Sequence, residues 1–225
     1  MDLMKISILS LFPQMFEVFN HSIVGKARMN NYVDIEIINI RDFSNNKHNK
    51  VDDYPFGGGA GMLMSVEPIY NSICYARRNL DGRVIYLGPR GDTFNQNKAY
   101  ELSDNNHLIF LCGHYEGIDE RSYNFIDEEI SLGDFILTGG EMAAIPIIDS
   151  IVRLLSGVIN KNSLDNESFT NDLMDFPQYT RPREFMGISV PNVLLSGNHK
   201  EIDKWRREES LKITRKYKRY LLKDK

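Results

Sequence analysis

Two short apolar runs constrain the fold of this 225-residue chain more than any other part of it. The segments RVIYLG (83–88) and HLIFLCG (107–113) are almost wholly apolar and end at glycine. Such runs are typical of strands buried on both faces of a parallel sheet. KISILSLF (5–12), VDIEIINI (33–40) and EISLGDFILTGG (129–140) are predicted to be further strands.

Helical patterns separate these strands. Residues 66–78, 96–102 and 141–155 have helical spacing, and a further amphipathic helix can begin at Pro13. Alternating strands and helices predict an α/β fold with a mostly parallel sheet. The length suits one large domain, or one domain with a small second one.

The C-terminal part has a different character. Residues 176–225 hold 13 Lys and Arg against 6 Asp and Glu, whereas residues 1–175 hold 14 against 25. A helix is predicted after Ser196 or Asn198, with one side formed by Ile202, Trp205, Ile213, Tyr217 and Tyr220. The basic charge indicates either a nucleic-acid contact or a solvated helix face. A boundary between two domains is expected within residues 160–175.

Several classes of protein are not supported by the sequence. No run reaches the roughly 18 to 20 apolar residues of a membrane span, and no secretory signal is visible. Cys74 and Cys112 lie far apart without metal-type spacing, which indicates reduced thiols in a cytoplasm. The glycine-rich segment 55–64 lacks the Lys-Ser/Thr of a P-loop, so it is either a mobile loop or a close backbone approach to a ligand or another chain.

Three of the predicted strands end in glycine turns, YLGPRG (86–91), LCGHYEG (111–117) and LGDFILTGGE (132–141). Ligands of open α/β sheets bind at the carboxyl ends of the strands, so these turns could hold a base and a ribose through the main chain. The acids Glu116, Asp134 and Glu141 would favour a cationic ligand over a di- or triphosphate. The alternative is ordinary turn chemistry.

Two further features could carry catalysis. Arg153 lies in an otherwise apolar helical run, where it either reaches the surface or stabilises a developing oxyanion. The polar segment NSLDNESFTN (162–171) contains Asp165 and Glu167. It is either an acidic linker or half of an active site that folds onto its substrate.

Long motifs in a fixed order resemble a known family. They are YPFGGGAGMLM, VIYLGPRG, LCGHYEGIDER, EEISLGDFILTGGE, DSIVR, LMDFPQYTRP and VPNVLLSGNHKEIDKWR. Together they closely resemble the bacterial tRNA (guanine-N1)-methyltransferases, the TrmD family of the SPOUT class. The likeness extends from residue 9 to about residue 215.

The resemblance implies a SPOUT-type α/β domain with a deep C-terminal trefoil knot over residues 1–160, a flexible linker over 161–175, and a small, basic, α-helical tRNA-binding domain over 176–225. It implies a cytoplasmic homodimer whose active site is shared between chains. It also implies a magnesium requirement, for which the sequence offers no dedicated ligands. The residues that it assigns to S-adenosylmethionine are Tyr86, Leu87, Gly88, Pro89, Gly113, Tyr115, Glu116, Leu132, Gly133, Asp134, Phe135, Ile136, Leu137, Gly139 and Gly140.

The implied reaction is methylation of guanine N1 at tRNA position 37, where position 36 is also G. The resemblance assigns Arg153 to stabilising O6, and it assigns the general base to Glu167, where the family carries Asp. Asp165 is the alternative base, and Asp175 matches an acid near the guanine. The rival hypotheses are a SPOUT enzyme for another RNA site and a non-catalytic tRNA-binding protein.

Overall fold

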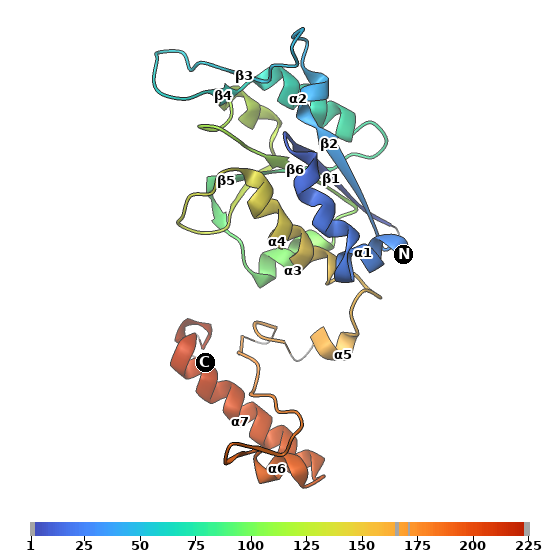
Figure 1. The fold of residues 1–225 in the computed structure, drawn as a ribbon, viewed down its shortest axis with the longest axis vertical. Helices are drawn as coiled ribbons and strands as arrows, with labels where there is room; N and C mark the ends of the chain where they lie inside the picture. The colour runs from blue at the N-terminus through green and yellow to red at the C-terminus, as the bar shows by residue number, and fades with distance from the viewer. Residues whose placement is uncertain (1–2, 165–166, 171, 223–225) are drawn as a thin grey trace. The chain divides into compact units, whose positions relative to one another are not determined.

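The computed structural model describes residues 3–164, 167–170 and 172–222. The chain divides into two units, Met1–Ile159 and Asn160–Lys225. Figure 1 shows the elements of both units.

The first unit is built on a five-stranded parallel sheet with the strand order β2-β1-β6-β5-β7. Its strands are β1 (Met4–Ser10), β2 (Val33–Asn39), β5 (Arg83–Thr93), β6 (His107–Cys112) and β7 (Glu128–Ser131). A short antiparallel hairpin joins β3 (Asp52–Asp53) to β4 (Leu63–Met64). The expected parallel sheet and its first four strands are therefore confirmed.

Two apolar layers cover the sheet. All six residues of β6 are buried: Leu108 and Phe110 belong to one layer, and Ile109 and Leu111 to the other. This alternation explains why β6 is apolar throughout, since neither of its faces meets water.

Helices supply the outer side of each layer. The helices α1 (Ser22–Met29), α3 (Gln96–Ser103) and α4 (Gly140–Val152) contribute to the layer that contains Phe110, together with the 3₁₀ helix Pro13–Asn20. Helix α2 (Val66–Ala76) contributes to the opposite layer. Shorter 3₁₀ turns are Ile40–Phe43 and Glu120–Phe125. The helix expected after Pro13 is thus a 3₁₀ helix, which α1 follows after His21.

The prediction of a strand over 129–140 is wrong beyond Ser131. β7 ends there, and residues 132–139 form a turn in which Gly133 has a φ of +147°. The apolar residues that resembled a strand, Phe135, Ile136 and Leu137, are exposed by 57%, 89% and 38%. An apolar run does not distinguish a core strand from an exposed apolar loop.

The second unit has one main helix, α7 (His199–Tyr217), preceded by α5 (Lys161–Leu164), α6 (Asn192–Leu195) and the hairpin of β8 (Glu184–Phe185) and β9 (Ile188–Ser189). A 3₁₀ turn, Arg219–Leu221, follows α7. The side chain of Asn198 accepts a hydrogen bond from the Glu201 N–H at 3.4 Å, which identifies Asn198 as the N-cap.

The predicted apolar side of α7 is wrong at its C-terminal end. The helix buries Ile202, Ser210 and Thr214, while Tyr217 is 63% exposed and Tyr220 lies beyond the helix, 64% exposed. The buried face includes small hydroxyl residues because the Thr214 hydroxyl bonds inside the unit, donating to Ser210 O at 2.7 Å and accepting from the Met174 N–H at 2.9 Å.

Candidate active site

The structure brings the three glycine turns together at the carboxyl edge of the sheet. The first turn, 86–91, lies inside β5, where the pairing with β7 shifts register between Leu87 and Asp92. The second turn follows β6, whose parallel pairing with β5 ends at Leu87 and Cys112, so both turns lie at the same edge of the sheet. The Gly140 N–H, at the start of α4, donates to Gly113 O at 2.8 Å. A Cβ added at Gly140 would lie 2.8 Å from the Cys112 Cα. The second and third turns are therefore in direct backbone contact.

Glycine also permits the close contact between the first two turns. A Cβ at Gly113 would lie 2.8 Å from the Tyr86 hydroxyl oxygen, and one at Gly88 would lie 2.4 Å from Glu129 Oε1. Tyr86 is only 6% exposed. Its burial, with a smaller contribution from the nearby Glu129 carboxylate, raises its pKa to about 12, so its hydroxyl stays neutral at physiological pH.

Two residues that sequence reasoning missed support the first turn. Glu129 accepts hydrogen bonds from the Arg90 N–H and from the Tyr123 hydroxyl, both at 2.8 Å. Tyr123 in turn packs edge-on against Tyr86, with 5.8 Å between ring centroids. Burial and the bond to Glu129 raise the pKa of Tyr123. These contacts hold the backbone of residues 86–90 in place. The contact between Arg90 and Glu129 spans 39 residues, so no local sequence motif indicates it.

The third turn is exposed at residues 134–138 and is held by hydrogen bonds at its start. Ser131 Oγ accepts from the Gly133 N–H at 3.1 Å, and the Phe135 N–H donates to Gly133 O at 2.9 Å. Asp134 is exposed, whereas Leu132 and Gly139 are half-buried. The turn therefore presents apolar side chains and one carboxylate beside the first two turns.

Glu141 does not have the role that the sequence suggested. It is 1% exposed and accepts a hydrogen bond from Ser10 Oγ at 2.8 Å, so its carboxylate lies in the interior and not at the ligand-facing surface. His114 Nδ1 lies 3.9 Å from Glu141 Oε2 and is a buried nitrogen without a hydrogen-bond partner among the described residues. Of the three acids, Glu116 and Asp134 are exposed.

The candidate catalytic residues belong to different units. Arg153 is the half-buried C-cap residue of α4 in the first unit. Its backbone N–H donates to Asp149 O at 3.1 Å. Glu167 and Asp175 are half-buried in the second unit. The Asp175 carboxylate accepts from the Phe176 N–H at 2.7 Å and from Gln178 Nε2 at 2.9 Å. Asp165 lies outside the described residues.

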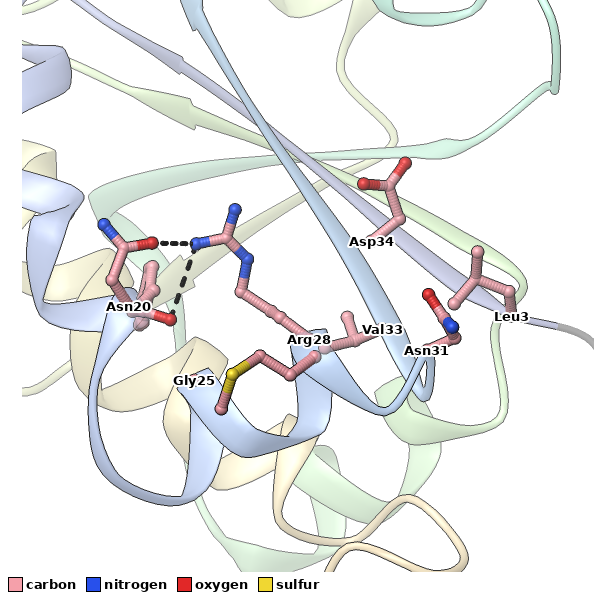
Figure 2. Close-up of a pocket in the computed structure, with 9 residues that line it drawn as sticks. Leu3, Asn20, Gly25, Arg28, Asn31, Val33 and Asp34 are labelled. Atoms are coloured by element: carbon pink, nitrogen blue, oxygen red, sulfur yellow. Dashed lines mark hydrogen bonds between the residues drawn. The ribbon is translucent and has the colours of Figure 1, made fainter.

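A pocket of about 410 Å³ lies elsewhere, at the amino ends of β1 and β2. Figure 2 shows the Arg28 guanidinium there, donating to the Asn20 side-chain oxygen and, at 3.5 Å, to Phe19 O. Because the strands are parallel, this pocket opens at the edge of the sheet opposite the glycine turns. It contains none of the predicted site residues.

Across residues 3–164, 167–170 and 172–222, no three Asp, Glu, His or Cys side chains gather closely enough to hold a metal ion. None of the helices in that same part of the chain is long and apolar enough to cross a membrane.

Comparison with known proteins identifies the relatives of this chain. The sequence profile described as tRNA (Guanine-1)-methyltransferase TrmD matches residues 4–224. A tRNA (guanine-N(1)-)-methyltransferase of Clostridium botulinum is 64% identical over 214 residues, which cover 95% of this chain and 90% of the relative. Enzymes of the same name from Clostridium beijerinckii and Clostridium tetani are 63% and 61% identical, covering 95% and 94% of this chain and 90% and 89% of their own lengths. The chain therefore belongs to the tRNA (guanine-1)-methyltransferase family, TrmD.

Proposed function

We propose that this chain methylates N1 of the guanine at tRNA position 37, in tRNAs with G at position 36, and that S-adenosylmethionine is the methyl donor. The observation that carries the proposal is the convergence of three glycine turns at one edge of the sheet, in a chain of this family. We propose that the protein is cytoplasmic, since the cytoplasm contains its tRNA substrate.

The turns fit the chemistry of this donor. Added Cβ atoms at Gly88, Gly113, Gly139 and Gly140 would each come within 2.8 Å of a neighbouring atom, so these turns can pack only as bare backbone. Their main-chain N–H and C=O groups suit a flat base and a ribose, and the exposed Asp134 and Glu116 suit a sulfonium cation. When bound, S-adenosylmethionine supplies an electrophilic methyl group. Residues 86–89, 113–116 and 132–140 would hold it.

The trefoil knot belongs to the same proposal. In a knotted SPOUT domain the last segment passes through a loop of the earlier chain. The tight packing of the start of α4 against Cys112 and Gly113 supports this path for residues 132–152.

The chain's own residues supply the proton chemistry. Guanine N1 carries a proton at neutral pH and becomes a good nucleophile only when that proton leaves. We assign its removal to the Glu167 carboxylate and the stabilisation of the negative charge at O6 to the Arg153 guanidinium. Asp175, whose carboxylate is oriented by Phe176 and Gln178, would position the guanine. The alternative base is Asp165.

The described residues do not offer magnesium a site of three clustered ligands. The magnesium requirement stays a prediction from the resemblance. Methyl transfer measured after chelation, with and without added magnesium, tests it.

The direct test of the proposed function is transfer of labelled methyl from S-adenosylmethionine to tRNA transcripts that carry G at positions 36 and 37. Nucleoside analysis should find N1-methylguanosine at position 37 and none in a transcript with A at that position. Methylation elsewhere would favour the rival SPOUT enzyme. Binding of tRNA without methylation would favour the non-catalytic protein.

A substitution in the backbone contact tests the donor site. Gly140→Ala would force a Cβ to within 2.8 Å of Cys112 Cα and so separate two of the turns. Overpacking of this kind costs about 1–3 kcal/mol, so the Kd for S-adenosylmethionine, measured by titration calorimetry, is expected to rise about 5- to 150-fold.

Gly25→Ala is the matched control for this substitution. Its Cβ would lie 2.5 Å from Asn20 O, at the opposite edge of the sheet. It should lower the melting temperature and leave the donor Kd unchanged. Equal donor affinity in both variants would contradict the proposed site.

A second copy of the chain is proposed to complete the active site. Four large apolar residues are between 36% and 48% exposed near the second turn: Phe12, Met15, Tyr115 and Met142. The ring of His114 lies 4.9 Å from that of Phe12 and 5.0 Å from that of Tyr115, which makes part of this set contiguous. Exposed apolar surfaces of this kind mark protein–protein contacts.

Met142→Glu tests the homodimer. Wild type is expected to sediment at twice the chain mass of 26.0 kDa. The variant is expected to shift toward the single-chain mass and to lose methyl transfer, because a buried unpaired charge is costly at an interface. Met29→Glu, at a residue that is 74% exposed near the opposite edge, should sediment as wild type. A wild-type protein of single-chain mass would contradict the dimer.

A further inference from the structure

The hairpin that carries the glycine-rich segment is attached to the second glycine turn. The Met64 N–H donates to Gly117 O and the Asp119 N–H to Met64 O, both at 2.9 Å, and the Glu116 N–H donates to Met62 O at 3.1 Å. A Cβ at Gly61 would lie 2.3 Å from Cγ of Glu116. Figure 1 shows the segment between β3 and β4 as a long loop that extends from the unit. The base of this loop is therefore part of the candidate donor site.

The tip of the loop presents an aromatic ring to solvent. The Gly58 N–H donates to Pro55 O at 3.2 Å, and Gly57 has a φ of +88°, as expected for the third residue of a type II turn. Phe56 is the second residue of that turn, and its exposure is 101%. Cβ atoms added at Gly57 and Gly58 would meet none of the described atoms within 4 Å. Phe56 thus makes no contribution to the core.

We propose that Phe56 stacks on a base of the tRNA next to the target guanine, an inference that rests on the proposed function. Three glycines follow Phe56, and its ring, at 101% exposure, has both faces open, which stacking requires. Aromatic rings accept any base, because every base has a π-face. The preceding segment carries the exposed cation Lys47, which suits a phosphate of the same strand. Lys50 is exposed as well, and its Nζ lies 3.3 Å from Asp53 Oδ1. RNA is therefore the occupant that this surface favours over a second protein chain.

The test compares tRNA binding by Phe56→Ala, Phe56→Leu and Phe56→Tyr with that of wild type. Loss of one base–aromatic stack is expected to raise the tRNA Kd about 5- to 150-fold in the alanine variant. The leucine variant should bind as weakly as the alanine variant, and tyrosine should restore binding. The Kd for S-adenosylmethionine and the slope of log Kd against log salt should stay unchanged, since no phosphate contact is lost.

Met29→Ala, which removes an exposed apolar side chain at the opposite edge, is the matched control and should bind tRNA as wild type does. Wild-type tRNA affinity in Phe56→Ala or in Phe56→Leu would overturn the inference. A fall in sedimenting mass in Phe56→Ala would also overturn it, because the ring would then contact a second copy. A wild-type enzyme that fails to methylate tRNA would overturn the proposed function instead, so the two failures are distinguishable.

Discussion

Glu167→Gln is expected to slow methyl transfer by about 10²- to 10⁴-fold, the loss expected when a general base is removed. Glutamine keeps the size of the side chain and its hydrogen-bonding capacity, but it cannot accept the N1 proton. Single-turnover transfer to the tRNA transcript measures the chemical step apart from product release. The tRNA Kd is expected to change little, because the neutral side chain still fits the same place.

Three further variants give this experiment its controls. Glu167→Asp installs the residue that the resemblance implies at this position and should retain most of the activity. Asp172→Asn removes an exposed carboxylate from the same segment and should leave the rate unchanged. If Glu167→Gln stays near the wild-type rate while Asp165→Asn loses it, the base is Asp165 and the assignment of Glu167 is wrong.

Arg153→Ala is expected to lower the single-turnover rate by about 10²- to 10³-fold, the loss typical of removing one donor to a developing oxyanion. Arg153→Lys keeps the charge but not the planar pair of donors, so it should recover only part of that loss. Because Arg153 caps α4 and is half-buried, the melting temperature of each variant must be measured as well.

A matched arginine separates stability from catalysis. Arg28→Ala removes a guanidinium that is bonded to Asn20 at the opposite edge of the sheet. It should keep the wild-type rate even if its melting temperature falls. A wild-type rate in Arg153→Ala would show that another group stabilises O6.

The parallel sheet could be predicted from sequence because its inner strands are apolar on both faces. β6 is the clearest case, since no residue of it meets water. The strand expected over 129–140 is wrong beyond Ser131 for the opposite reason. Phe135, Ile136 and Leu137 are apolar without being in the core, and periodicity carries no information about what covers them.

The convergence of the glycine turns at one edge of the sheet was predictable, since each turn is local in sequence. The side-chain contacts that hold these turns in place could not be predicted from sequence. Glu129 holds Arg90 from a different strand, and Glu141 bonds to Ser10 across 131 positions, so neither role appears in any local pattern. The distance between Arg153 and Glu167 could not be predicted from sequence either, because the two residues belong to different units.

The glycine turns have a consequence for inhibition. A Cβ at Gly140 would lie 2.8 Å from the Cys112 Cα and 2.9 Å from the Gly113 N, so the backbone leaves no room for a side chain there. A resistance mutation must change a side chain, and at Gly140 any added side chain would displace two of the turns. A competitive inhibitor that binds backbone N–H and C=O groups would therefore leave the enzyme few ways to escape it without damaging its own substrate binding.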